Sequence, residues 1–266
     1  MSLTSREQRF TFDEVAELYD RARPGYPEAL IDDLVSLSGI APGARVLELG
    51  CGTGQLTRSL ARRGFRVLCL EPGANMASVA RQRLADFPAV EVVSESFEKW
   101  PIETGAFALV ASAQAFHWID PAIRFTKAAE ALHEGASLAV IGNAVVSRES
   151  PVWTAIQTAY AAHTPELSAG VATRWYGPEG PIRGDFDESA LFGPVGSRHH
   201  PWSRIYTASE YLDLLRTHSD HRLLPEAQHE LLLSAIRRVI DLHGGSVEVE
   251  YEAHLYVAPK AIREGS

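Results

Sequence analysis

Three alternating glycines stand in the sequence ELGCGTG at residues 48–54. The apolar run before them, RVLEL at residues 45–49, predicts a buried strand, and residues 55–63 predict a helix. Glycines at such a turn let the backbone bend tightly and let a ligand approach the N–H groups at the helix start. The dinucleotide fingerprint GxGxxG would need its third glycine at position 55, where Gln55 stands. The spacing therefore predicts a ligand-binding turn and disfavours a nicotinamide-dependent oxidoreductase.

A second acid follows the next predicted strand, which covers residues 65–70, because Glu71-Pro72 comes directly after this apolar run. A carboxylate at this place can accept hydrogen bonds from both hydroxyls of a ribose. The alternatives are an exposed acid at a strand end for Glu71, and a plain strand-to-helix turn for the glycines.

Short β-rich runs alternate with helical segments along the first half of the chain, which is typical of a parallel α/β sheet. After Asn143 this alternation changes, and residues 165–201 are rich in Gly and Pro, so we expect a loop-rich insertion there. A capping box at Thr207-Ala208-Ser209-Glu210 predicts a helix start. Further strands are expected at residues 90–93, 107–111, 136–141, 247–251 and 253–257, and further helices at about 27–37, 75–84, 121–133, 151–160 and 225–243.

These elements predict a Rossmann-like, doubly wound α/β sheet that is mostly parallel, with an antiparallel last strand and a helical or loop lid insertion. We expect residues 1–143 to form the cofactor-binding core with an N-terminal closing helix. Residues 144–205 are expected to form the substrate lid insertion. Residues 206–266 should supply C-terminal helices and the final strand that completes the core sheet.

The composition excludes several classes of protein. The 266 residues carry a net charge of −9, which argues against a nucleic-acid binder and against docking on anionic membrane. The chain has 2 cysteines, so a disulfide framework is excluded and a reducing cytoplasm fits. We therefore expect a cytoplasmic protein without a nucleic-acid or membrane partner; its oligomeric state stays open.

Four motifs stand in order along the chain: ELGCGTG at residues 48–54, Glu71, ESFEKWP at residues 95–101 and AQAFHW at residues 113–118. They resemble those of a class I S-adenosylmethionine-dependent methyltransferase. They are most similar to the small-molecule type 11 branch, which includes relatives of the trans-aconitate methyltransferases. The similarity covers residues 12–142, and the lead-in YDRARPGYP at residues 19–27 resembles the same branch.

The resemblance implies S-adenosylmethionine as cofactor and S-adenosylhomocysteine as product. It places the glycine turn at the methionine part, Glu71 at the ribose, and Ser96 with Phe97 at the adenine. The family often has Asp where Ser96 stands, and a neutral hydroxyl should accept a hydrogen bond more weakly. The implied cofactor-binding residues are Tyr19, Arg23, Glu48, Gly50, Gly52, Thr53, Gly54, Glu71, Pro72, Ser96, Phe97, Ala113 and Gln114.

The resemblance also implies a small-molecule methyl acceptor, with O-methylation favoured. His117 follows a predicted strand, where the carboxyl ends of parallel strands place ligands, so it is a candidate general base. A packed structural histidine is the alternative for His117, and plain packing is the alternative for Trp118 and Tyr26. The segment Arg174-Trp175-Tyr176 is either a mobile substrate lid or a solvated loop. The expected acceptor-site residues are Tyr26, His117, Trp118, Trp175 and Tyr176.

One other hypothesis remains open at this point. A catalytically silent protein could keep the fold as an S-adenosylmethionine-binding scaffold, and detecting methyl transfer to any acceptor would discriminate it from the enzyme. A metal site is not expected, because neither His199-His200 nor His218-x-x-His221 has the carboxylate or cysteine company expected of a zinc site.

Overall fold

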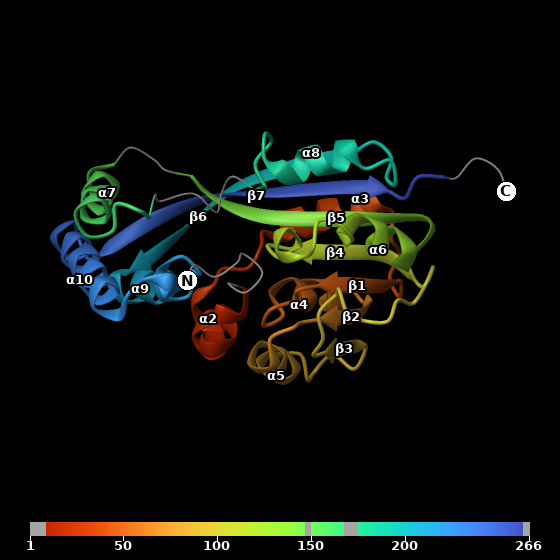
Figure 1. Ribbon diagram of the computed structural model, residues 1–266, viewed down its shortest axis with the longest axis horizontal. Helices are drawn as coiled ribbons and strands as arrows, with labels where there is room; N and C mark the ends of the chain where they lie inside the picture. Colours follow the sequence, from red (N-terminus) through yellow and green to blue (C-terminus); the bar gives the residue numbers. More distant parts are fainter. Residues whose placement is uncertain (1–8, 147–149, 168–174, 263–266) are drawn as a thin grey trace.

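Seven strands form one twisted sheet in the order β3-β2-β1-β4-β5-β7-β6 (Figure 1). The computed structural model describes residues 9–146, 150–167 and 175–262. The strands β3, β2, β1, β4 and β5 run parallel, and β7 runs antiparallel to both β5 and β6. The expected mostly parallel, Rossmann-like sheet is thereby confirmed. The bounds are β1 Arg45–Leu49, β2 Arg66–Leu70, β3 Val90–Val93, β4 Phe107–Ala113, β5 Leu132–Val146, β6 Gly196–Thr207 and β7 Ser246–Pro259.

Helices cover both faces of the parallel part, so its central strands are apolar on both sides. Leu30, Leu56 and Ala80 bring α3, α4 and α5 into one core on the first face. Ala128 and Phe186 bring α6 and α8 into a second core on the opposite face. The bounds are α3 Glu28–Ser38, α4 Gln55–Arg62, α5 Ala74–Arg83, α6 Arg124–Ala131 and α8 Pro181–Glu188.

The segment 165–201 differs from the expected loop, because its described part holds α8 and the first half of β6. The strand β6 continues to Thr207, so it also crosses the expected boundary at residue 205. Pro201 disguises this strand in the sequence, since proline cannot donate to a ladder. It is tolerated here because β6 lies at the edge of the sheet. The two short strands expected at residues 247–257 are in fact the single strand β7.

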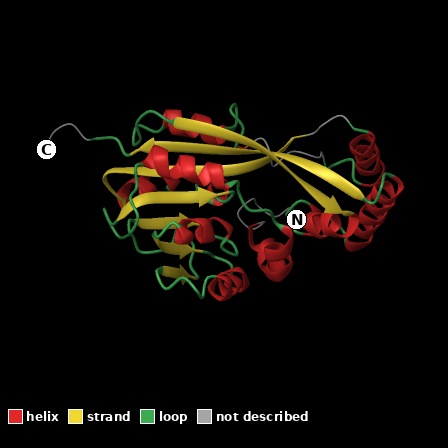
Figure 2. Cartoon of the chain, turned by 180° about the vertical axis from the view of Figure 1, so that it is seen from behind, coloured by secondary structure: helices red, strands yellow, loops and turns green. Residues whose placement is uncertain are grey.

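The long strands β5, β6 and β7 project beyond the parallel part and carry a separate group of helices (Figure 2). This part is called the tail here, and its helices are α7 Pro151–His163, α9 Ala208–Arg216 and α10 Glu226–Leu242. Their apolar side chains pack on Val247, Val249 and Tyr251 of β7 in a third core. The capping box expected at Thr207 is present at the start of α9. No helix among the described residues is long and apolar enough to cross a membrane.

The N-terminal segment, made of η1 Arg9–Val15 and α2 Ala16–Ala22, lies between the parallel part and the tail (Figure 1). On one side, the Asp13 carboxylate accepts a hydrogen bond of 2.9 Å from the backbone N–H of Met76 at the start of α5. On the other side, Glu14 forms an ion pair with Arg222 of the tail. The segment therefore contacts both halves of the molecule.

Candidate functional site

The glycine turn has the conformation that its sequence predicts. Gly50, Gly52 and Gly54 have φ of 68°, 59° and 93°, in the left-handed region that favours glycine. A Cβ built on Gly50 would lie 2.5 Å from the Cβ of Ala115, so a side chain there would displace the strand-end loop after β4. The turn is thus shaped both by its own backbone and by the neighbouring loop.

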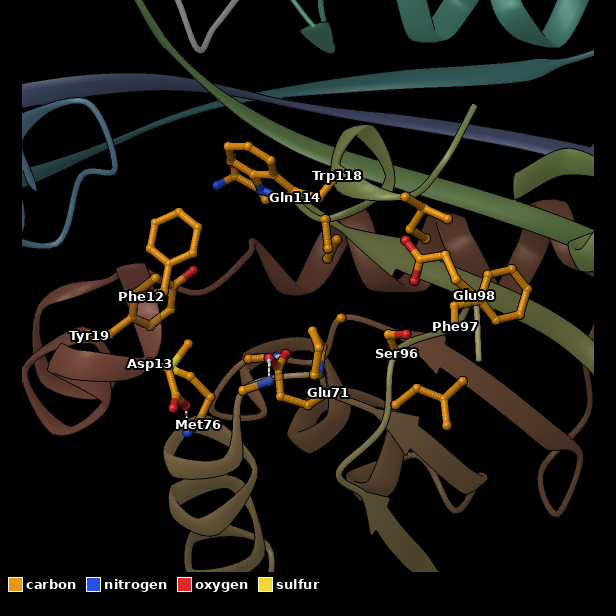
Figure 3. A pocket seen from close by; sticks show the side chains of 18 residues that line it. Phe12, Asp13, Tyr19, Glu71, Met76, Ser96, Phe97, Glu98, Gln114 and Trp118 are labelled. Carbon is orange, nitrogen blue, oxygen red and sulfur yellow. Dashed lines mark hydrogen bonds between the residues drawn. The ribbon is translucent and has the colours of Figure 1, made fainter. Parts of the chain in front are cut away.

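Glu71 turns its carboxylate toward the glycine turn (Figure 3). Its Oε2 accepts from the backbone N–H of Gly52, and its Oε1 accepts from the backbone N–H of Gly73, both at 2.9 Å. The residue is 8% exposed. These two hydrogen bonds hold the carboxylate in one orientation.

A first cavity of about 690 Å³, including space open to solvent, lies in front of this carboxylate. Gln114 and Trp118 lie across the cavity from Glu71, and Phe12 and Tyr19 close it from the N-terminal segment (Figure 3). Its lining residues are Phe12, Asp13, Tyr19, Gly50, Gly52, Leu70, Glu71, Pro72, Gly73, Met76, Ser96, Phe97, Glu98, Ala113, Gln114, Ala115, Trp118 and Ile119.

A second cavity of about 390 Å³ shares residues of the glycine turn with the first. Burial raises the pKa of Glu48 to about 8, although a hydrogen bond from the Thr57 hydroxyl at 2.7 Å opposes the shift. Burial also raises the pKa of Tyr26 well above its usual value. Both groups are therefore protonated at neutral pH. The lining residues are Tyr19, Arg23, Pro24, Tyr26, Glu48, Gly50, Cys51, Gly52, Gln55, Leu56, Ala113 and Gln114.

Arg23 brings a positive charge to the second cavity. Its Nε donates to the Thr217 hydroxyl and its Nη2 donates to the Thr217 carbonyl, both at 2.8 Å. Its guanidinium carbon also lies 5.0 Å from the centre of the Tyr19 ring. The side chain is thus oriented by the tail, and Thr217 is buried.

Gln114 is the non-glycine residue with positive φ among the described residues, with φ of 55°. A glutamine in the left-handed region is uncommon, and such conformations cluster at ligand sites. Its backbone N–H donates to the Ile141 carbonyl at 2.8 Å, which holds the conformation at the end of β4. Gln114 lines both cavities, so this strained residue lies where they meet.

His117 lies in a cluster of aromatic side chains beside the first cavity. Its Nδ1 is 2.6 Å from the Tyr176 hydroxyl, and its ring stacks on Trp175 with centres 5.5 Å apart. Burial, together with the charge of Arg124, lowers the pKa of His117 to about 3, so the imidazole is neutral at physiological pH. Tyr176 packs against Gly142, where a Cβ would lie 2.1 Å from its ring carbon Cγ.

The structure brings most of the expected cofactor-binding residues together around the two cavities. Thr53 and Gly54 do not line either cavity; the Thr53 hydroxyl instead accepts from Gln55 at 2.8 Å. Of the expected acceptor residues, Tyr26 lines the second cavity and Trp118 lines the first. His117 lines neither cavity and contacts Trp118, Trp175 and Tyr176. Arg174 of the expected lid lies outside the described residues.

Sequence reasoning missed eight lining residues of the first cavity, which are Phe12, Asp13, Leu70, Gly73, Met76, Glu98, Ala115 and Ile119. The first two belong to the N-terminal segment, which reaches the cavity only through tertiary packing, so no local pattern could have indicated them. Glu98 stands inside the quoted motif ESFEKWP, which could have indicated it. Cys51 and Cys69 are free and buried, as expected for packing residues.

Comparison with known sequences places part of the chain in a described family. Residues 46–135 match the family model of a methyltransferase domain. An uncharacterized methyltransferase of Mycobacterium tuberculosis is 34% identical over 143 residues, covering 54% of this chain and 56% of the relative. One from Geobacillus kaustophilus is 31% identical over 154 residues, covering 54% of this chain and 71% of the relative. The chain thus spans about half the length of the first of these relatives.

Comparison with solved structures agrees on the fold. One similar structure is phosphoethanolamine N-methyltransferase 2 of Haemonchus contortus, solved with S-adenosyl-L-methionine. The superposition includes 98% of this chain and 61% of the Haemonchus chain. The TM-score is 0.58 and the identity is 16%, so the likeness concerns the fold alone.

Proposed function

Because this chain belongs to the methyltransferase family, we propose that it transfers a methyl group from S-adenosylmethionine to a small-molecule acceptor and releases S-adenosylhomocysteine. The observation that carries this proposal is the Glu71 carboxylate, which is fixed by the N–H groups of Gly52 and Gly73 and lines the first cavity. The close approach of Gly50 to Ala115 fits as well, because the turn has no room for a side chain.

The cofactor would lie across both cavities. Glu71 would accept from the ribose hydroxyls, and Ser96 with Phe97 would border the adenine in the first cavity. In the second cavity, Arg23 would use Nη1 to hold the methionine carboxylate, since Nε and Nη2 already bind Thr217. Glu48 would accept from the amino group there.

When bound, the cofactor supplies a positively charged leaving group, so the chain mainly has to align the acceptor and exclude water. Phe12, Tyr19 and Trp118 provide apolar surface over the cavity, with Phe12 5.8 Å from Tyr19 and 6.0 Å from Trp118 between ring centres. These rings would keep water from the reacting atoms.

We place the acceptor on the side of Tyr26 and Trp118, with His117, Trp175 and Tyr176 shaping its boundary. The neutral His117 would orient the acceptor or accept a proton from a hydroxyl, and O-methylation is the favoured chemistry. A carboxylate acceptor would need no base, in keeping with the similarity of the motifs to the trans-aconitate methyltransferase branch. The segment 144–205 would then cover the acceptor. The free cysteines accord with a cytoplasmic protein.

Two measurements test the proposal. Calorimetric titration with S-adenosylhomocysteine should show one binding site per chain. Incubation with S-adenosylmethionine and fractionated metabolite pools should then give a product heavier by one CH₂, detected by mass spectrometry. Binding without any product from small-molecule or RNA fractions would favour the silent scaffold, and product from the RNA fraction alone would refute the small-molecule acceptor.

A further inference from the structure

Three histidines and an aspartate lie close together in the tail, between α9 and the first turn of α10. One ligand atom from each of His218, Asp220 and His221 lies within 4.8 Å of the other two. His218 and Asp220 lie in the turn after α9, and His221 begins η4 His221–Leu223. His229 joins them from the first turn of α10. The expectation that the histidine pair lacks a carboxylate is wrong here, because Asp220 stands between its two members.

We propose that this cluster binds one divalent transition-metal ion of the zinc class, with His218, Asp220, His221 and His229 as ligands. Imidazole nitrogens together with a carboxylate oxygen suit zinc. The site is separate from the cofactor cavities and does not depend on the proposed methyl transfer.

The distance between two of the histidines matches the separation of two ligands on one ion. Nδ1 of His221 lies 3.4 Å from Nε2 of His229, which is long for a hydrogen bond between nitrogens. Two nitrogens that each lie about 2.1 Å from a tetrahedral zinc are about 3.4 Å apart. The two rings therefore already have the separation that a shared ion requires.

Tyr160 of α7 orients His221 in the manner common for metal ligands. Its hydroxyl lies 2.9 Å from Nε2 of His221, and both side chains are buried. When Nε2–H donates to this hydroxyl, Nδ1 keeps its lone pair on the side of His229. A hydrogen bond on the far nitrogen commonly fixes the tautomer of a ligating histidine. Asp220 fixes the backbone, since it accepts from the N–H of His221 at 2.8 Å.

Charges around the cluster partly oppose a cation and partly favour it. Arg23 faces His218 and His221, and Arg216 and Arg222 face His229. The last two are paired with acids, Arg216 with Glu230 and Arg222 with Glu14. Asp220 supplies a negative charge within the cluster itself and offsets Arg23.

A bound ion would fix the turn after α9 to the start of α10. Thr217, the residue before the first ligand, holds both Nε and Nη2 of Arg23, which lines the second cavity. The ion would therefore steady the support of this arginine without touching any ligand in the cavities.

The test uses the full chain without an affinity tag, treated with a chelator and then dialysed. Zn²⁺ is titrated against a chromophoric competitor, and Co²⁺ is added separately to record its visible absorption. We expect one equivalent of Zn²⁺ to bind, the strong visible bands of four-coordinate cobalt, and a higher Tm with the metal. The absence of one-to-one binding would overturn the proposal.

Three variants locate the ion. Tyr160→Phe should weaken binding by about 10–100-fold, as expected for a group that orients a ligand, and His229→Gln should weaken it further. His199→Gln, at an exposed position on β6, is the matched control and should bind as the wild type does. Circular dichroism confirms that each variant is folded. Wild-type affinity in folded His229→Gln, or lost binding in His199→Gln, would place the ion elsewhere and refute the assignment.

Discussion

Replacing Glu71 by alanine should weaken the binding of S-adenosylhomocysteine by about 10- to 100-fold. The carboxylate is 8% exposed, and each oxygen already accepts one backbone N–H at 2.9 Å, so it is oriented before a ligand arrives. A hydrogen bond to a charged acceptor contributes about 1.5–3 kcal/mol. Since about 1.4 kcal/mol corresponds to a tenfold change in affinity, the loss of one or two ribose contacts gives this range.

The same substitution should also lower the free energy of unfolding, because the N–H groups of Gly52 and Gly73 lose their acceptor. A polar group left buried without a partner costs about 1–3 kcal/mol, and water entering the cavity will reduce that cost. Calorimetric titration measures the affinity and chemical denaturation measures the stability. Glu91→Ala, on the exposed side of β3, removes the same charge away from the cavities and is the control. Affinity equal to that of the wild type in folded Glu71→Ala would remove Glu71 from the binding site.

Three further outcomes are expected. The pKa of Glu48 is raised from 4.5 to about 8, so between these pH values the folded chain holds a proton that the unfolded chain releases, and stability is lost as the pH rises. The Tm of Glu48→Gln should therefore rise relative to that of the wild type toward pH 8. A difference in Tm that does not depend on pH would contradict the burial argument. Gly142→Ala should displace Tyr176 and lower the free energy of unfolding, measured with denaturant, by at least about 1–3 kcal/mol. Gly184→Ala is the control and should be tolerated, because no atom lies within 4 Å of the added Cβ. Equal stability of the two variants would refute the close packing. His117→Ala should keep the cofactor affinity and slow methyl transfer. The rate should fall by about 10²–10⁴-fold if the imidazole is a general base, and by less, without pH dependence, if it only orients the acceptor. A rate equal to that of the wild type would show that His117 is a packing residue.

The central part of the fold could be predicted because local patterns determine it. The run at residues 45–49, the glycines after it and Glu71 after the next strand are each legible within a few residues. Parallel strands then bring their carboxyl ends to one edge, so Glu71 and the glycine turn had to meet. The structure places them within hydrogen-bonding distance.

The rest depended on contacts between distant residues. The strand β6 alternates weakly and contains a proline, so only its pairing with β7 reveals it. Phe12 and Asp13 reach the first cavity across more than fifty residues of sequence. His229 meets His221 only because α10 packs beside the turn after α9. His117 was expected in a ligand site, but its contact with Tyr176 could not be predicted from the sequence. Tyr176 reaches His117 because its ring packs against Gly142.

The three long strands have a consequence for how the molecule can open. Because β5, β6 and β7 run unbroken from the parallel part into the tail, bending between the two halves would have to break ladder hydrogen bonds. A hinge between the halves is therefore costly, and the tail serves as a fixed wall. The N-terminal segment is attached differently, through side chains such as Asp13, Glu14 and Arg23. Entry and exit of a ligand should therefore be controlled by the detachment of this segment, with the sheet staying rigid.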